Sequence, residues 1–287
     1  MNRQVIFTSD DFGLSHGVNT AVERAWREGL LTCASIMPGE AGFDEAVDIA
    51  RRNQGLQVGL HLTLVQGRAV LPPEQLAGIT DRNGNFPDNP VAAGMRYFFD
   101  AGLRTALRRE IEAQIVRVRD AGINLTHIDG HLNIHLHPTV FGILSELMPV
   151  YGITSFRLSR ERLVHNLKHG RERIAGKVTE RAIFGSLARH ALRELKLRSI
   201  GYAGEVKGVL NSGRMTEPYI LSILDGLRDG LTELYFHPGC LPDGEITRRM
   251  PDYRHEEELA SLTSPAVRHR LQELDIRVVN YRGDVKC

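Results

Sequence analysis

The stretch QVIFTSDDFGLSHGVNTAVERAWRE, residues 4–28, indicates how this chain is built. Its first five residues form a short apolar run, which is typical of a buried strand, and residues 18–28 carry apolar side chains at helical spacing. Ser9, Asp10 and Asp11 lie between the two, where the strand ends. A strand that leads directly into a helix is the βα unit of which parallel sheets are made.

Similar pairs of an apolar run and a helical pattern follow along the chain. About eight such pairs predict the α/β class and a (β/α) barrel, complete or distorted, in preference to a doubly wound open sheet. Residues 66–100 have no periodicity and contain several turn signals, so we expect an irregular insertion there. Further strands are expected at residues 31–37, 56–64, 125–129, 153–158, 200–203, 231–236 and 276–281. Helices are expected at residues 43–52, 103–121, 140–151, 177–195 and 219–228, with two more before the last strand.

The composition is that of an ordinary globular protein. Of the 287 residues, 42% are hydrophobic and 25% are charged, which is enough for a packed core. No repeat, low-complexity tract or linker divides the chain, so we expect a single domain over residues 1–287. The net charge of +1 provides no global field for nucleic acid, and no nucleic-acid partner is expected.

The cysteine spacing and the length of the apolar runs indicate in which cellular compartment the protein is expected. Cys33, Cys240 and Cys287 have no CxxC spacing and suit reducing conditions. The N-terminal residues lack the long apolar region of a signal peptide, and no apolar run is long enough to span a membrane. The cytoplasm is therefore the expected location.

Residues capable of chemistry gather where the expected strands end. Asp10 and Asp11 follow the first strand, and His61 lies in the third. The run THIDGHLNIHLHP, residues 126–138, follows the fourth strand, and His237 follows the seventh. In a parallel barrel the carboxyl ends of all strands face the same way. These distant segments are therefore expected to converge.

The histidine-rich run indicates a metal site. Residues two apart on a strand share a face, so an extended segment would align His127, Asp129 and His131. A carboxylate and two imidazoles suit zinc, iron or a similar divalent ion. A lone histidine more often caps a helix or binds a carbonyl, but this cluster comes together with two adjacent acids and His61.

Asp10 and Asp11 are expected to serve different partners, because neighbouring side chains on a strand point apart. One metal ligand and one general base is a natural division. The alternative is a helix-start signal, with Ser15 as the cap. A glycosidase pair fits less well, since its carboxylates face each other across the sugar at about 5 Å or more. The string Asp11-Phe12-Gly13 matches a kinase motif but lacks the other kinase motifs before it.

His237 precedes Pro238 and Gly239 at the end of an apolar strand. An imidazole at this position can protonate a departing amine as a general acid. A structural histidine before a turn is an equally good interpretation. Nearby Cys240 carries no sign of an activated thiol, which disfavours a cysteine nucleophile.

Four stretches resemble the YdjC-like carbohydrate deacetylase family and occur in the family's order. The resemblance implies a distorted, TIM-like (β/α) barrel related to polysaccharide deacetylases. It also implies a metal-dependent amide hydrolase that acts on an N-acetylated amino sugar. The matching stretches are TSDDFGLSHGVNTAV (8–22), VGLHLTL (58–64), THIDGHLNIHLHP (126–138) and ELYFHPG (233–239).

The same resemblance implies roles for single residues. Asp11, His61 and His131 would ligate a divalent metal, Mg²⁺ or Zn²⁺. Asp10 would be the general base and His237 the general acid. The residues that would lie behind the ligands or face the substrate are His127, Asp129 and His135.

Three further stretches resemble the hopanoid-biosynthesis-associated (HpnK-like) branch of this family. That likeness implies an N-acetylglucosaminyl hopanoid lipid as the substrate. The chain departs from the branch at residues 129–131, which read Asp-Gly-His where the branch often has Asn-Ala-His. Two alternatives stay open, a deacetylase of soluble chito-oligosaccharides and a non-catalytic carbohydrate-binding relative. The three stretches are GRAVLPPEQL (67–76), GMRYFFDAGLRTALRREIEAQ (94–114) and HLHPTVFGIL (135–144).

Residues 157–198 are strongly basic, with 12 Lys or Arg against 4 Asp or Glu. The simpler interpretation is a barrel helix with a solvated basic face. The alternative is peripheral contact with an anionic surface such as the inner membrane, which a lipid substrate would require. The sequence determines no oligomeric state and leaves a homodimer open.

Overall fold

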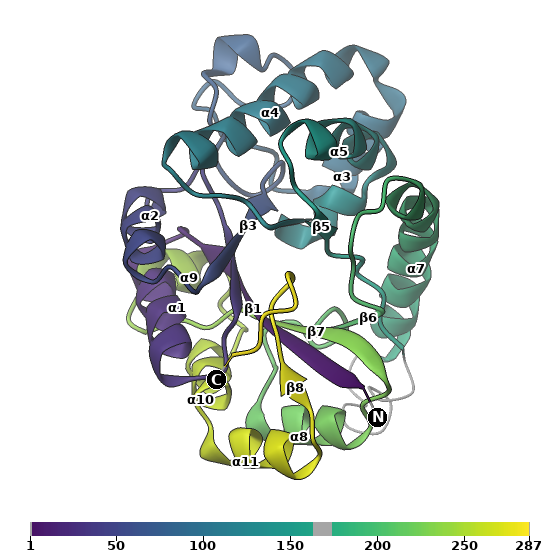
Figure 1. Ribbon diagram of the computed structural model, residues 1–287. Helices are drawn as coiled ribbons and strands as arrows, with labels where there is room; N and C mark the ends of the chain where they lie inside the picture. The colour runs from purple at the N-terminus through teal and green to yellow at the C-terminus, as the bar shows by residue number, and fades with distance from the viewer. Residues whose placement is uncertain (1, 163–173, 287) are drawn as a thin grey trace.

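Eight parallel strands form the centre of the computed structural model, which describes residues 2–162 and 174–286 (Figure 1). Their order across the sheet is β5-β4-β3-β2-β1-β7-β6, and β8 pairs with β1 beside this path. All pairings between these strands are parallel. The strands are β1 (Arg3–Phe12), β2 (Cys33–Ile36), β3 (Gln57–Leu62), β4 (His127–Gly130), β5 (Ser155–Phe156), β6 (Glu205–Lys207), β7 (Gly230–Phe236) and β8 (Arg277–Val278).

Strand β1 lies in the middle of the sheet and pairs with three neighbours. Its residues Val5, Ile6 and Phe7 are fully buried. A parallel strand that is covered on both faces reads as a continuous apolar run, which is the pattern found in the sequence. β7 pairs along one edge of β1, while β8 and β2 pair with the first and second halves of the other edge.

The outer strands β5 and β6 close the barrel only loosely. An isolated bridge joins Ser155 to Gly201, and the backbone N–H of Val206 donates to the carbonyl of Arg160 at 3.0 Å. These contacts replace a continuous ladder between the two strands. The predicted α/β class and distorted, TIM-like barrel are therefore confirmed.

Helices surround the sheet, with α1 and α2 on one side, α3, α4 and α5 across the top, and α8, α10 and α11 below it in Figure 1. Leu107, Ile111, Ile115 and Val118 form an apolar stripe along α4 and are fully buried in the hydrophobic core. No helix among the described residues has the length and apolar character needed to cross a membrane. The helices are α1 (His16–Glu28), α2 (Phe43–Arg52), α3 (Pro90–Phe99), α4 (Arg104–Asp120), α5 (Pro138–Val150), α7 (Ile174–Leu197), α8 (Glu217–Asp225), α9 (Gly244–Arg249), α10 (His255–Leu262) and α11 (Pro265–Glu273).

Three expectations about elements were wrong. The region expected to be irregular contains α3, because Asn89 and Pro90 form a helix start and not a turn. The Asn89 side chain accepts hydrogen bonds from the backbone of Val91 and Ala92, and proline fits the first helical position. The strand expected at residues 200–203 lies a few residues later, at β6, and three helices, not two, lie between β7 and β8.

The helix expected at residues 177–195 is present as α7. Part of the basic segment, residues 163–173, lies outside the described residues.

Candidate metal centre

Asp11, His61 and His131 meet at the carboxyl ends of β1, β3 and β4. Oδ1 of Asp11 lies 3.3 Å from Nε2 of His61 and 3.1 Å from Nδ1 of His131. One potential ligand atom from each residue lies within 4.8 Å of the others, and all three residues are buried. The parallel arrangement thus brings together three residues from segments up to 120 positions apart.

An irregularity in β1 directs its two aspartates differently. The pairing of β1 with β2 shifts register between Ser9 and Phe12, and Asp11 has a φ of 59°. A bulge of this kind re-aims side chains next to active sites. A non-glycine residue in the left-handed region costs about 1–3 kcal/mol, which the surrounding packing must offset. Asp10 and Asp11 consequently contact different partners, although both face the interior of the site.

His61 is oriented from behind by Asp129. Nδ1 of His61 lies 2.7 Å from Oδ1 of Asp129, which leaves Nε2 directed at Asp11. The second oxygen of Asp129 accepts a hydrogen bond of 2.6 Å from the hydroxyl of Ser35. A carboxylate behind a histidine fixes the ring orientation and raises its basicity, which is the usual arrangement around a metal ligand.

The three residues fit a divalent cation. Oδ2 of Asp11 is buried and has no hydrogen-bond partner among the described residues. Burial raises the pKa of Asp11, but His131 and His61 outweigh this effect and hold it well below its ordinary value. Burial lowers the pKa of His61, but Asp129 and Asp10 outweigh it and raise that pKa to about 10. A carboxylate and two imidazoles leave further coordination positions for water and substrate.

Asp10 is held in a two-pronged ion pair with Arg157, which follows β5. Both carboxylate oxygens accept hydrogen bonds of 2.7 Å from the guanidinium. The same guanidinium contacts Asp129 at 2.7 Å and Glu233 of β7 at 2.9 Å. All four side chains are buried, so one cation balances three carboxylates at the base of the site.

Arg157 and Glu233 were not identified from the sequence. Arg157 was counted with the basic segment, as surface charge. Glu233 did carry a signal, because a carboxylate within an otherwise apolar strand is rarely buried without a partner.

His237, at the end of β7, faces the same cleft as Asp10, His61 and His131. Its backbone is fixed, because its N–H donates to Glu258 at 2.5 Å and its carbonyl lies 2.7 Å from Nδ1 of His255. Nδ1 of its own ring is buried without a hydrogen-bond partner among the described residues. Burial lowers the pKa of His237. The ring packs edge-on against Tyr235 and Tyr253, with ring centroids 5.6 and 5.0 Å away, and its unbonded Nδ1 favours a role toward a ligand.

His127 and His135 lie behind the site and not in the cleft. Strand β4 ends at Gly130, and the 3₁₀ turn His131–Leu136 follows, so the extended alignment expected for the run fails beyond that point. Nε2 of His127 lies 3.1 Å from the Ser35 hydroxyl, and Nε2 of His135 lies 3.0 Å from the carbonyl of Arg157. Burial lowers the pKa of each to about 3.

The site opens into a cleft of about 840 Å³ with polar and apolar lining. Asp10, His61, His131 and His237 belong to the polar lining. Apolar lining comes from α3 and α7, with the side chains of Val91, Met95, Phe98, Ile183, Phe184 and Leu187.

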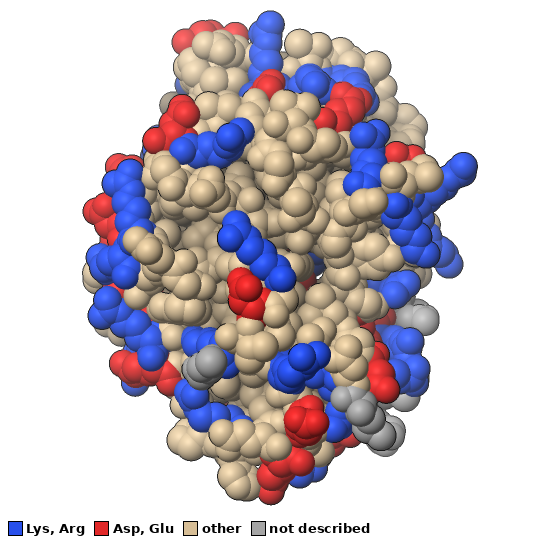
Figure 2. Space-filling model, in the orientation of Figure 1, with Lys and Arg blue, Asp and Glu red and all other residues tan. Residues whose placement is uncertain are grey.

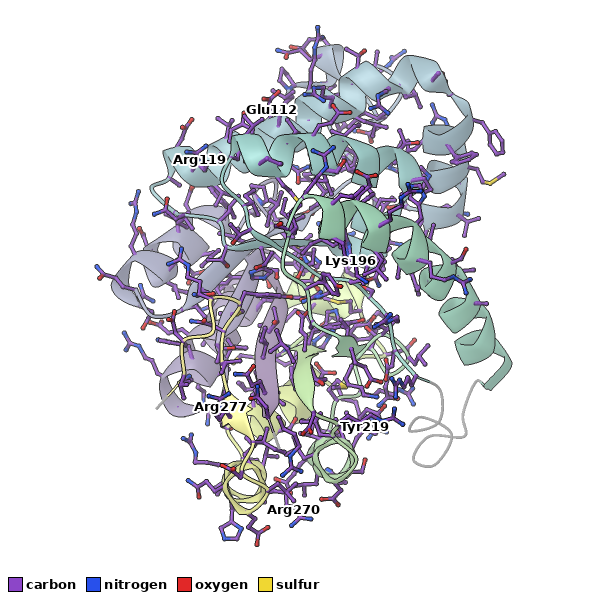
Figure 3. The ribbon with its side chains drawn as sticks, turned by 45° about the vertical axis from the view of Figure 1, so that its right-hand side comes forward. Glu112, Arg119, Lys196, Tyr219, Arg270 and Arg277 are labelled. Atoms are coloured by element: carbon purple, nitrogen blue, oxygen red, sulfur yellow. The ribbon has the colours of Figure 1, made fainter. Side chains whose placement is uncertain are left out.

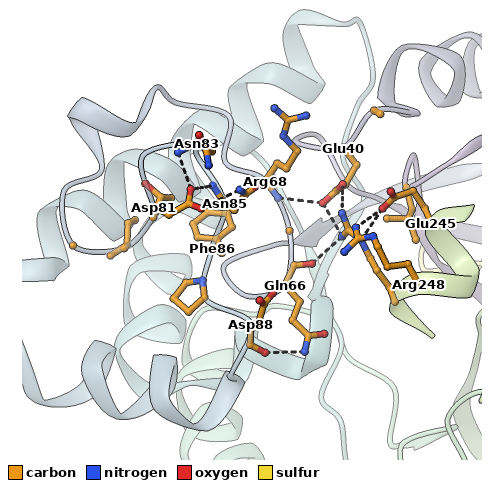
Figure 4. A pocket seen from close by; sticks show the side chains of 18 of the residues that line it. Glu40, Gln66, Arg68, Asp81, Asn83, Asn85, Phe86, Asp88, Glu245 and Arg248 are labelled. Atoms are coloured by element: carbon orange, nitrogen blue, oxygen red, sulfur yellow. Dashed lines mark hydrogen bonds and ion pairs between the residues drawn. The ribbon is translucent and has the colours of Figure 1, made fainter. Parts of the chain in front are cut away.

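A polar cavity of about 1100 Å³ adjoins this cleft and shares Gln66 and Arg249 with it (Figure 4). Arg249 separates the two spaces, because its guanidinium contacts both oxygens of Glu40 and the carbonyl of Gln66. Gln66 has a φ of 47°, so the wall contains a second strained position.

Comparison with known proteins gives a family and a fold. The sequence matches the family described as "YdjC-like protein" over residues 4–273. A "Carbohydrate deacetylase" of Geobacillus stearothermophilus is 26% identical over 284 residues, which cover 98% of this chain and 98% of that protein. Another, from Brevibacillus brevis, is 36% identical over 150 residues. That match covers 52% of this chain and 57% of the relative, so the chain spans little more than half of the latter's length.

One solved structure has the same fold. It is described as a putative cellobiose-phosphate cleavage protein from Enterococcus faecalis, and it matches with a TM-score of 0.76 and 23% identity. The match covers 98% of each chain. At this identity the likeness establishes the barrel alone.

Proposed function

Because the chain belongs to the YdjC-like family, we propose that it is a metal-dependent hydrolase that removes an N-acetyl group from an amino sugar. Relatives named carbohydrate deacetylases support this reaction. One observation supports the proposal most directly. Asp11, His61 and His131 lie together, and Asp10 and His237 lie beside them in the same cleft. A binding protein without catalysis has no need for two further titratable groups beside a metal site.

In the proposed reaction Asp11, His61 and His131 hold the cation. A divalent ion there, Mg²⁺ or Zn²⁺, would polarise the amide carbonyl and lower the pKa of water. Asp10 takes a proton from the attacking water, and Arg157 keeps its carboxylate in one orientation. His237 gives a proton to the amine as the C–N bond breaks, which releases acetate and the free amino sugar.

The test is acetate release by the purified protein from N-acetylated sugars, with and without a chelator. We expect release that stops when the metal is removed and returns when Mg²⁺ or Zn²⁺ is added back. Metal bound without any acetate released from oligosaccharide or glycolipid would favour the non-catalytic relative.

For the substrate we propose the N-acetylglucosaminyl group of a hopanoid lipid. The apolar lining of the cleft supports this choice over soluble chito-oligosaccharides, since a free sugar oligomer offers little apolar surface for it to cover. Comparing turnover of the glycolipid in detergent with turnover of chito-oligosaccharides distinguishes the two. Faster turnover of the oligosaccharides would contradict the lipid substrate.

A lipid substrate requires peripheral contact with a membrane, and the basic face of α7 supports such contact. Arg189, Arg193 and Lys196 are exposed on α7. No ion pair is found for them among the described residues. Figure 3 shows Lys196 near the end of α7. In Figure 2 basic side chains gather along the edge where α7 lies. Anionic lipid attracts such residues by about 1 kcal/mol each.

A further inference from the structure

Helix α3 is apolar on both of its faces. Ala93 and Tyr97 are buried on one face, and the Tyr97 hydroxyl donates to the carbonyl of Leu64 at 2.8 Å. Arg96 is the one charged residue of the helix. A helix that is apolar all round is normally buried in a core or in a membrane, so this helix requires an explanation. Its other face exposes Val91 by 75%, Met95 by 55%, Phe98 by 55% and Phe99 by 72%.

The exposed face of α3 is also the rim of the cleft. Val91, Met95 and Phe98 line the cleft together with Ile183 of α7, whose side chain is itself exposed. Leu132, the exposed neighbour of His131, continues the apolar lining toward the candidate metal ligands. An apolar path therefore runs from the outside of α3 to the centre of the site.

The charges beside this path favour a lipid surface over a protein as its partner. α3 contains no acidic residue, and its single charge is positive. The described part of α7 exposes Arg189, Arg193 and Lys196. α7 contains two acids, Glu180 near its start and Glu194, and Glu194 pairs with Arg198. An apolar strip with cations on the other helix of the cleft is a pattern of segments that lie in the interface of an anionic membrane, and the nearest acids, Asp88 and Asp100, stand at the two ends of α3.

We propose that the exposed face of α3 docks onto an anionic lipid layer, with Phe98 and Phe99 entering the acyl boundary, so that the cleft receives the apolar part of the substrate directly from that layer. The biological purpose of this docking rests on the proposed function, the deacetylation of a lipid-linked sugar. The docking itself is measured without any substrate.

The experiment is flotation of the full chain with phosphatidylcholine vesicles that contain phosphatidylglycerol. We expect the wild type to float, and Phe98→Ser/Phe99→Ser to bind about tenfold or more weakly. The matched control is Val150→Ser on α5, because Val150 is 72% exposed, as Phe99 is, and does not line the cleft. It should bind like the wild type.

Docking is overturned if the wild type stays with the soluble fraction, or if the double variant floats as well as the wild type. A dimer in solution that the double variant dissociates would overturn it as well, because a second copy would then cover α3. The single variant Phe99→Ser, outside the cleft lining, should release acetate from soluble oligosaccharides at the wild-type rate. If neither the wild type nor the variants release acetate from any substrate, but the wild type still floats with the vesicles, the proposed function is rejected and the docking remains supported.

Discussion

Arg157 holds the buried charges of the site together. It is 1% exposed and contacts Asp10, Asp129 and Glu233. Removing the guanidinium takes the counter-charge from Asp10 and Glu233 and leaves Asp129 with His61 alone, and an uncompensated buried charge is far more costly than the intact cluster.

We expect Arg157→Met to lower the free energy of unfolding by about 3–5 kcal/mol, measured by urea denaturation. Arg160→Met is the matched control. Arg160 is exposed and donates one hydrogen bond to the carbonyl of Gly204, so its loss should cost about 1 kcal/mol or less. Equal losses in the two variants would mean that the buried cluster has no special importance.

The roles proposed for the adjacent aspartates, catalysis for Asp10 and metal binding for Asp11, can be separated by substitution. Asp10→Asn keeps the shape of the side chain but removes the proposed base, so acetate release should fall by about 100-fold or more while the metal content stays normal. Asp11→Asn should no longer retain the metal, so the metal content of this variant, measured after dialysis, should be close to zero. Near-normal turnover by the Asp10 variant would show that another group takes the proton.

At the scale of elements, the close packing of β3 against β4 depends on Gly59. A Cβ at this position would lie 2.4 Å from the ring of His127. The ring cannot move easily, because it is hydrogen-bonded to Ser35 and stacks on Tyr281 at 4.3 Å. The contact therefore has no flexible partner that could yield.

Gly59→Ala should lower the free energy of unfolding by about 1–3 kcal/mol through this overlap. Gly185→Ala is the opposite control, since Gly185 lies within α7 and a Cβ there meets nothing within 4 Å. Alanine should stabilise that helix by up to about 1 kcal/mol. Thermal unfolding of both variants measures the difference, and a stabilising effect at Gly59 would contradict the packing described.

The sequence predicted most elements because periodicity and apolar runs are local properties. The sequence did not predict α3, because Asn89 and Pro90 are compatible with either a turn or a helix start. Which of the two forms depends on whether Tyr97 can be buried in the core. Strand β4 was predicted at residues 125–129, and the alignment of His131 with His127 and Asp129 failed because nothing local predicts that the chain turns after Gly130.

At the scale of the whole molecule, two buried histidines make stability depend on pH. Burial lowers the pKa of His127 and of His135 to about 3. In the unfolded chain each titrates near about 6.5. Between these values the unfolded chain binds protons that the native protein does not, so these two histidines lower the stability as the pH decreases below about 6.5. Buried Glu258, whose pKa is raised to about 7 by desolvation, acts in the opposite direction and offsets part of this loss.

The expected loss is up to about 1.4 kcal/mol per pH unit for each histidine. Urea denaturation between about pH 7 and 4.5 measures it. His127→Gln should give a shallower slope, because one of the two sites is removed. A slope unchanged by the substitution would assign the acid sensitivity to other groups.

The sequence by itself determined the class of fold and the segments that carry the chemistry. Buried parallel strands read as apolar runs, and residues that follow such strands are bound to meet at one end of the sheet. The segments that carry Asp11, His61 and His131 were therefore expected to converge, while the choice of these three residues as ligands came from the resemblance to a family.

Only the tertiary structure decided how those residues are supported. The bulge that separates Asp10 from Asp11, the buried position of His127 and the contacts of Arg157 with three other strands all depend on register and side-chain direction. These are set by packing between elements far apart in the sequence. A local pattern therefore identifies the residues of the site, but it does not specify the partner of each.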